Sequence, residues 1–252
     1  MELSITQWLI ILLSAFLSGI SKTGLPGVSI LIVPLMAMVL PTKESVGLVL
    51  PTLIFADIFA AFYYRKHAHW KHLMHLMPCT LLGIIAGFIV LKRIESPQLR
   101  PIIGAIVMAM LIIQTCYEYY KNKKTSSDQN LDAPAISRPL AVIFGFAAGM
   151  TTMMANAAGP VMILYLLASG LPKNEFIGTR AWFFFIINWV KVPFSIHLGL
   201  ITAASLKVNL MAAPAIAIGA IAGILLLKHI PQKLFRIVAR VMAALSALKL
   251  LS

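Results

Sequence analysis

Long apolar runs dominate this sequence and decide what the chain can fold into. A bilayer-spanning helix needs about 20 apolar residues. Six runs meet that length, at 45–64, 73–91, 101–119, 175–197, 202–227 and 231–251. Hydrophobic residues make up 60% of the chain and charged residues only 12%, so these runs are too many and too long for a soluble core. The sequence therefore predicts an all-α polytopic membrane protein.

Two further apolar stretches are interrupted by polar, glycine-rich breaks. The stretch at 5–40 is broken at 18–27 (SGISKTGLPG), and the stretch at 140–168 is broken at 151–160 (TTMMANAAGP). Glycine and proline disfavour helix continuation, so we expect the pieces on either side to be half-length helices that stop at membrane depth. Unwound backbone at that depth is tolerated only where protein or a water-filled cavity surrounds it. We therefore interpret each stretch as a broken, re-entrant helix pair.

The two halves of the chain repeat each other in sequence. The motif Leu-Pro-x-x-Glu-x-x-Gly begins at Leu40 and again at Leu171, an offset of 131 residues. The motif Gly-x-Ile-Ala-Gly-x-x-x-Leu-Lys-x-Ile begins at Gly83 and again at Gly219, an offset of 136 residues. Two matched motifs in the same order indicate an internal duplication.

The duplication predicts a first transmembrane repeat at 1–120, a polar cytoplasmic linker at 121–138 and a second transmembrane repeat at 139–252. Each repeat would contain one re-entrant pair and three full spans. Because three crossings are an odd number, the second repeat would be inverted relative to the first. This arrangement places 12 Lys and Arg residues on the linker's side of the membrane and 6 on the other, which agrees with the positive-inside rule. In the alternative, each broken pair crosses the membrane once, which gives eight crossings with about equal numbers of Lys and Arg on the two sides.

The breaks are the candidate substrate site, because matched broken helices in inverted repeats mark the midplane site of many transporters. The helices that begin at Val28 and Pro160 would direct free N–H groups and a partial positive charge toward the membrane centre. The predicted substrate-binding residues are Ser21, Lys22, Thr23, Gly24, Gly27, Thr151, Thr152, Asn156 and Gly159. This set of donors fits a small oxyanion such as sulfite, a sulfonate or a carboxylate. In the alternative interpretation, glycine and proline only kink a packed helix and Lys22 extends to the interface.

Three polar residues inside full spans form a second candidate group: Asp57, Asn188 and Lys191. By the 131-residue offset, Asp57 corresponds to Asn188. A buried carboxylate can carry a coupling proton, and it can equally be the structural partner of Lys22 or Lys191, since intramembrane charges usually pair. The sequence leaves both roles open.

Several other functions find no support in the sequence. The net charge of +13 lies mostly in short loops, which is typical of membrane topology and does not call for nucleic acid. No nucleophile-and-base motif and no phosphate-binding loop is present, so we expect neither an enzyme with catalytic residues nor a cofactor. We expect no metal either, because the histidines near residue 70 do not have zinc-site spacing. The expected partners are a small anion and the lipid bilayer, and a homodimer is compatible with the sequence.

These motifs resemble the TauE/SafE sulfite exporter family over nearly the whole chain. The resemblance is carried by Gly19-x-x-Lys22-x-Gly24-x-x-Gly27 with Pro34, the Pro41/Glu44/Gly47 turn, Tyr63-Tyr64-Arg65 before Trp70, and Gly219-x-x-x-Gly223. It implies a permease of the bacterial inner membrane that moves small sulfur-containing or organic anions outward and uses an ion gradient, which we take to be protons. The first break is less glycine-rich than is common in this family, so the resemblance does not name the substrate.

Two alternative functions make different predictions. A passive anion channel of the same fold would show only downhill flux that is independent of a proton gradient. A non-transporting intramembrane enzyme or scaffold would show no flux.

Overall fold

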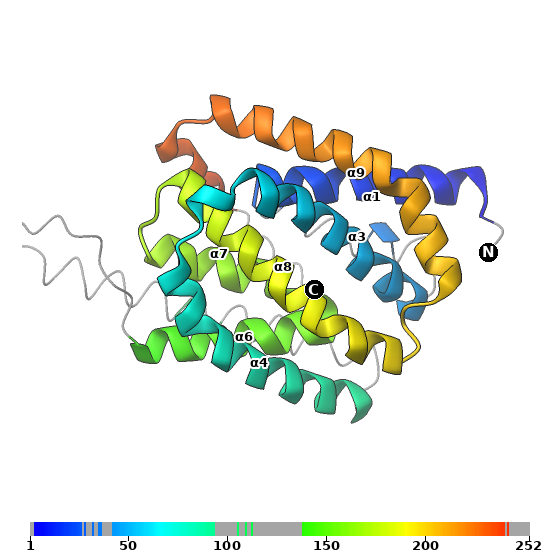
Figure 1. Cartoon of the computed structure of the whole chain (residues 1–252), viewed down its shortest axis with the longest axis horizontal. Helices are drawn as coiled ribbons and strands as arrows, with labels where there is room; N and C mark the ends of the chain where they lie inside the picture. Colours follow the sequence, from blue (N-terminus) through cyan, green and yellow to red (C-terminus); the bar gives the residue numbers. More distant parts are fainter. Residues whose placement is uncertain are drawn as a thin grey trace, which may run out of the picture. The chain divides into compact units, whose positions relative to one another are not determined.

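The computed structural model describes residues 3–26, 28, 32, 35–36, 42–93, 105, 109, 112, 138–239 and 241, and this part of the chain contains helices and no strand. The elements are α1 (Ile5–Thr23), α3 (Thr42–Tyr63), the short 3₁₀-helix η2 (Arg65–His67), α4 (Trp70–Arg93), α6 (Arg138–Ala155), α7 (Ala158–Ala168), α8 (Lys173–His197) and α9 (Ala203–His229) (Figure 1). Among them, α1, α4 and α9 are long and apolar enough to cross a membrane. The predicted all-helical polytopic membrane fold is confirmed.

Four predicted spans coincide with observed helices, namely α3, α4, α8 and α9. The start of α9 is defined by a capping box, in which Thr202 and Ser205 exchange side-chain hydrogen bonds with each other's backbone N–H groups at 3.0 and 3.1 Å. The linker predicted at 121–138, apart from Arg138, and most of the spans predicted at 101–119 and 231–251 lie outside the described residues.

The first break is shorter than the sequence predicts. Helix α1 continues through Ser18 to Thr23, so the prediction of a half-length helix ending before residue 18 is wrong. Polar side chains fit inside this helix because they bond to its own backbone. The hydroxyl of Ser18 donates to the carbonyl of Ser14 at 2.7 Å, and that of Thr23 lies 3.0 Å from the carbonyl of Gly19. With 19 residues, α1 is long enough to be a candidate span.

The second break is also shorter than predicted. Helix α6 continues to Ala155, past the predicted end at Met150, and only Asn156 and Ala157 separate it from α7. Asn156 turns the chain with a positive φ of 54°, a conformation that asparagine tolerates better than most residues. Helix α7 has 11 residues, as expected for a half-length helix, but Pro160 is its third residue and not its first. Proline is tolerated there because backbone N–H groups in the first turn have no partner within the helix. The helix expected after the first break, at 28–40, lies mostly outside the described residues.

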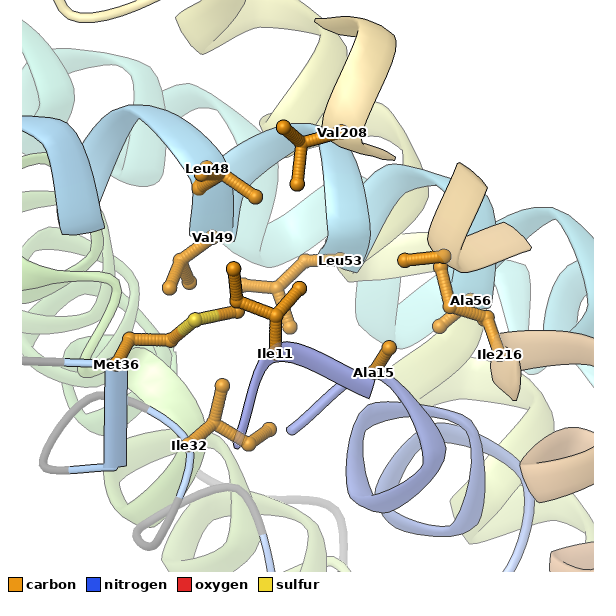
Figure 2. Close-up of a cluster of buried hydrophobic side chains, with 11 residues drawn as sticks. Ile11, Ala15, Ile32, Met36, Leu48, Val49, Leu53, Ala56, Val208 and Ile216 are labelled. Carbon is orange, nitrogen blue, oxygen red and sulfur yellow. The ribbon is translucent and has the colours of Figure 1, made fainter. Parts of the chain in front are cut away.

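The chain forms two compact units, and each one combines segments from both halves of the sequence. The first unit comprises 1–73 and 173–239, and the second comprises 74–172 and 240–252. In the first unit, α1, α3 and α9 pack around a cluster of buried apolar side chains. Ile11 of α1 points toward Val49 and Leu53 of α3 within this cluster (Figure 2). The predicted repeat boundaries at 1–120 and 139–252 stay a prediction.

The same helix pair is built twice, once in each unit. In the first unit, a Cβ atom at Gly219 of α9 would collide with the backbone of Phe16 on α1. In the second unit, a Cβ atom at Gly83 of α4 would collide with the backbone carbonyl of Phe146 on α6. The glycines are 136 residues apart and their partners 130 apart, so the duplication seen in the motifs extends to helix packing. Whether the repeats are inverted in the membrane stays a prediction.

Candidate functional site

The first unit encloses four charged side chains. Lys22 of α1, Asp57 of α3, and Arg180 and Lys191 of α8 are 4%, 0%, 2% and 2% exposed. Among the side chains whose burial the structure describes, no other charged one is buried. Three cations therefore share the interior with one carboxylate. Burying charge is costly unless an opposite charge lies nearby, so this excess of positive charge favours binding of an anion.

The charged and amide groups predicted inside the spans lie together around Asp57. The ammonium of Lys22 is 2.7 Å from one carboxylate oxygen of Asp57, and the amide of Asn188 donates to the other oxygen at 2.7 Å. The ammonium of Lys191 lies 3.5 Å from the amide oxygen of Asn188. Lys22 is thus buried and paired, and the alternative in which it extends to the interface is wrong. Asp57 thus forms an ion pair with Lys22, and its role in transport stays a prediction.

By the 131-residue offset of the repeated motif, Asp57 corresponds to Asn188 in the predicted repeats, and the structure joins the two residues by a hydrogen bond. Their direct hydrogen bond places the equivalent points of α3 and α8 against each other. At this contact the first predicted repeat contributes a carboxylate, Asp57, and the second contributes an amide, Asn188.

Sequence reasoning missed Arg180, which it counted among the charges of the cytoplasmic loops. The prediction included it only in the count of 12 Lys and Arg residues on the linker's side of the membrane and gave it no role in the site. In the structure one guanidinium nitrogen, Nη1, donates to the carbonyl of Ser21 at 2.7 Å inside the first unit. The Nε–H group of Arg180 is also buried and has no hydrogen-bond partner among the described residues. The missed signal was helical spacing: 180, 184, 188 and 191 lie on one face of α8.

The aromatic ring of Phe184 lies between two of these cations. The ammonium of Lys22 is 4.1 Å from the ring centroid, and the guanidinium carbon of Arg180 is 5.5 Å from it. A ring face attracts cations without adding a negative charge. Phe184 therefore contacts both cations without adding a negative charge of its own.

The other predicted residues of the first break have packing contacts. The Thr23 hydroxyl lies 2.8 Å from the carbonyl of Ala220 on α9, and a Cβ atom at Gly24 would collide with the backbone of Gly223. Ser21 is buried and meets Arg180 through its carbonyl. Gly27 lies outside the described residues. Thr23 and Gly24 thus hold the end of α1 against α9, which positions Lys22.

The predicted residues of the second break belong to the second unit. Thr151 and Thr152 are buried in α6, and the Thr151 hydroxyl lies 2.7 Å from the carbonyl of Ala147. Asn156 forms the turn, and Gly159 lies in the first turn of α7, which has no side-chain cap. Uncapped N–H groups can bind an anion. A substrate-binding role for these four residues stays a prediction.

The fold defines a polytopic helical membrane protein whose interior holds a cluster of charged side chains. The sequence matches the family model described as sulfite exporter TauE/SafE over residues 11–250. The chain therefore belongs to the TauE/SafE sulfite exporter family, a family of membrane transporters. Comparisons with curated proteins and with solved structures gave no match.

Proposed function

We propose that this protein is a secondary transporter that exports a small sulfur-containing or organic anion, such as sulfite, a sulfonate or a carboxylate, across the bacterial inner membrane. The observation that carries the proposal is the excess of buried cations over buried carboxylates in the first unit. Membership of a transporter family supports the same function. An enzyme is not proposed, because the sequence carries no nucleophile-and-base motif and the family is one of transporters.

In this proposal Lys22 and Arg180 are the cationic contacts of the anion. Arg180 contributes its Nε–H group, which is buried without a partner among the described residues. Charge-assisted hydrogen bonds of this kind are about twice as strong as neutral ones. Lys22 would be shared between Asp57 and the anion, and Lys191 would add to the positive potential. Ser21, Thr23 and Gly24 support these contacts from the end of α1.

Asp57 is proposed to couple transport to the proton gradient. Its carboxylate holds Lys22 in an ion pair at 2.7 Å. Protonation of Asp57 would release Lys22 to bind the anion, so proton and anion would bind together and cross in the same direction. Net export would then follow the outward gradient of the anion, and a proton gradient directed inward would oppose it. The residue would then have both roles that the sequence left open.

The direct test is a flux screen with purified protein in proteoliposomes. Sulfite, thiosulfate, sulfoacetate, taurine and small carboxylates would each be tested with and without a pH gradient. We expect at least one of these anions to show flux that changes with the gradient. Downhill flux that ignores the gradient would favour a passive channel, and no flux from folded protein would favour a scaffold or an enzyme.

The Asp57→Asn variant should keep anion flux but lose its dependence on the pH gradient. Asparagine has nearly the same shape as aspartate and cannot exchange a proton. Glu175→Gln is the matched control, because it neutralises a half-buried carboxylate at the start of α8 that lies outside the charge cluster. Initial rates at two pH gradients measure the effect. Persistent gradient dependence in Asp57→Asn would rule out this residue as the coupling group.

The Arg180→Lys variant should raise the half-saturating anion concentration by about tenfold, because lysine keeps the charge but loses the planar pair of donors. Arg65→Lys makes the same chemical change at an exposed position of η2 and should have no effect. Concentration-dependent flux measures both variants. Equal half-saturation in the two would remove Arg180 from the anion site.

A further inference from the structure

A hollow of about 440 Å³ opens in the first unit where three helix ends meet. It is lined by Tyr63, Tyr64 and His67 around η2, by Lys173 and Asn174 at the start of α8, and by Lys228 at the end of α9. Leu227 completes the lining. Each of these side chains except leucine carries a hydrogen-bond donor, and none is a carboxylate. The lining therefore favours an anion.

One cationic wall of the hollow is held in place by hydrogen bonds. The ammonium of Lys173 donates to the carbonyls of Leu227 and Ile230 at 2.9 and 2.7 Å. The backbone N–H of Lys173 donates to the side chain of Gln232 at 2.7 Å. These bonds fix the start of α8 against the end of α9, so the hollow needs little rearrangement to bind a ligand.

Two structural links join the lining of the hollow to the buried charge cluster: a hydrogen bond from Tyr64 and the helix α8. Tyr64 lines the hollow and is only 3% exposed, and its hydroxyl donates to the carbonyl of Thr23, the neighbour of Lys22, at 2.9 Å. On α8, Arg180 follows Lys173 by seven residues, which is two turns along the same face and about 10 Å along the axis. Both connections lead from the hollow toward the cations of the cluster.

We propose that this hollow is a vestibule that binds small oxyanions before they reach the buried cluster. The proposal rests on the proposed function, since it takes the transported anion as the occupant. The three segments that form the hollow all belong to the side of the membrane that the positive-inside count predicts as cytoplasmic. An exporter collects its substrate from that side. Lys228 is exposed and adds positive potential at the opening, which raises the local concentration of anions.

The first test compares two lysine variants on the same helix. In phosphatidylcholine vesicles, Lys228→Gln should raise the half-saturating sulfite concentration by about threefold to tenfold at low salt and leave the maximal rate unchanged. The difference should shrink at high salt. Lys207→Gln removes the same charge from an exposed position near the start of α9 and should leave half-saturation unchanged. Equal effects of the two substitutions, or no effect of either, would overturn the vestibule.

A second test reads the potential in the hollow without relying on transport. A cysteine at Asn174, in a chain with Cys79→Ser and Cys116→Ser, would be labelled by an anionic sulfonatoethyl and a cationic trimethylammonium-ethyl methanethiosulfonate. The ratio of the anionic to the cationic labelling rate should be several-fold higher at this cysteine than with a free thiol in solution. Lys228→Gln should lower this ratio, and Lys207→Gln should not. If the protein shows this preference but transports no anion, the anion-binding hollow is supported and the proposed transport function is contradicted. Equal labelling by the two reagents would overturn the vestibule.

A lipid phosphate has the same oxyanion chemistry and is distinguished by vesicle composition. If the transported anion is the occupant, the effect of Lys228→Gln should be present in vesicles of phosphatidylcholine alone. An effect that appears only when phosphatidylglycerol is added would overturn the vestibule and assign the hollow to a lipid headgroup.

Discussion

Replacing Lys22 by alanine is expected to reduce anion flux by at least about 100-fold, since the ion that binds the anion most directly is lost from a site shielded from water. The side chain of Lys22 is 4% exposed. Its helix, α1, contacts Asp57 through Lys22 and Arg180 through the carbonyl of Ser21. Flux into proteoliposomes at saturating anion measures the loss.

The control for this prediction must separate function from folding. Lys22→Ala leaves the carboxylate of Asp57 buried without its ion pair, and breaking a buried pair in this way costs about 3–5 kcal/mol. The double variant Lys22→Gln/Asp57→Asn removes both charges and should recover most of the thermal stability that Lys22→Ala loses. It should still show no concentrative flux. Normal flux in folded Lys22→Ala protein would place the anion site away from α1.

Sequence alone located most of the charge cluster. Lys22, Asp57, Asn188 and Lys191 each interrupt an apolar run, and an ionisable or amide side chain in such a run must find a polar partner. What the sequence could not show was which partner each one meets. The contacts join α1 to α3 across 35 residues of chain, and they join both of these helices to α8 across more than 100. Those pairings depend on tertiary packing alone.

Arg180 shows a specific limit of this reasoning. It lies seven residues after the start of α8, where arginine usually extends to the membrane interface. Its burial results from the end of α1 lying close to α8, so that the carbonyl of Ser21 meets its guanidinium. Hydropathy describes one segment at a time and cannot detect this contact.

The glycines of the first break were misread for a related reason. Glycine favours helix ends through its flexibility, and it also allows two helices to approach closely within a regular helix. Gly24 caps α1, whereas Gly19 lies inside α1 against the backbone of Ile216 and Ala220 on α9. Both glycines lie against the backbone of α9, and the sequence does not show which of them ends the helix.

The second large effect is expected at these close contacts. Gly219→Leu should destabilise the fold by about 3 kcal/mol or more, because its Cβ atom would collide with the backbone of Phe16, which cannot move aside as a flexible side chain can. Ile218→Leu places a leucine at the neighbouring position, whose side chain is 61% exposed, and should have little effect. Thermal unfolding of both variants in detergent, followed by size-exclusion chromatography, measures the difference.

The duplication extends this prediction to the second unit. Gly83 occupies the position equivalent to Gly219 and faces the backbone of Phe146 and Met150 on α6. If the repeat determines how both helix pairs pack, Gly83→Leu should destabilise the protein about as much as Gly219→Leu. Equal melting of Gly219→Leu and Ile218→Leu would mean that α1 and α9 tolerate wider separation than the structure shows. A loss at Gly219 without a loss at Gly83 would mean that only the first unit, which holds the charge cluster, depends on this close contact.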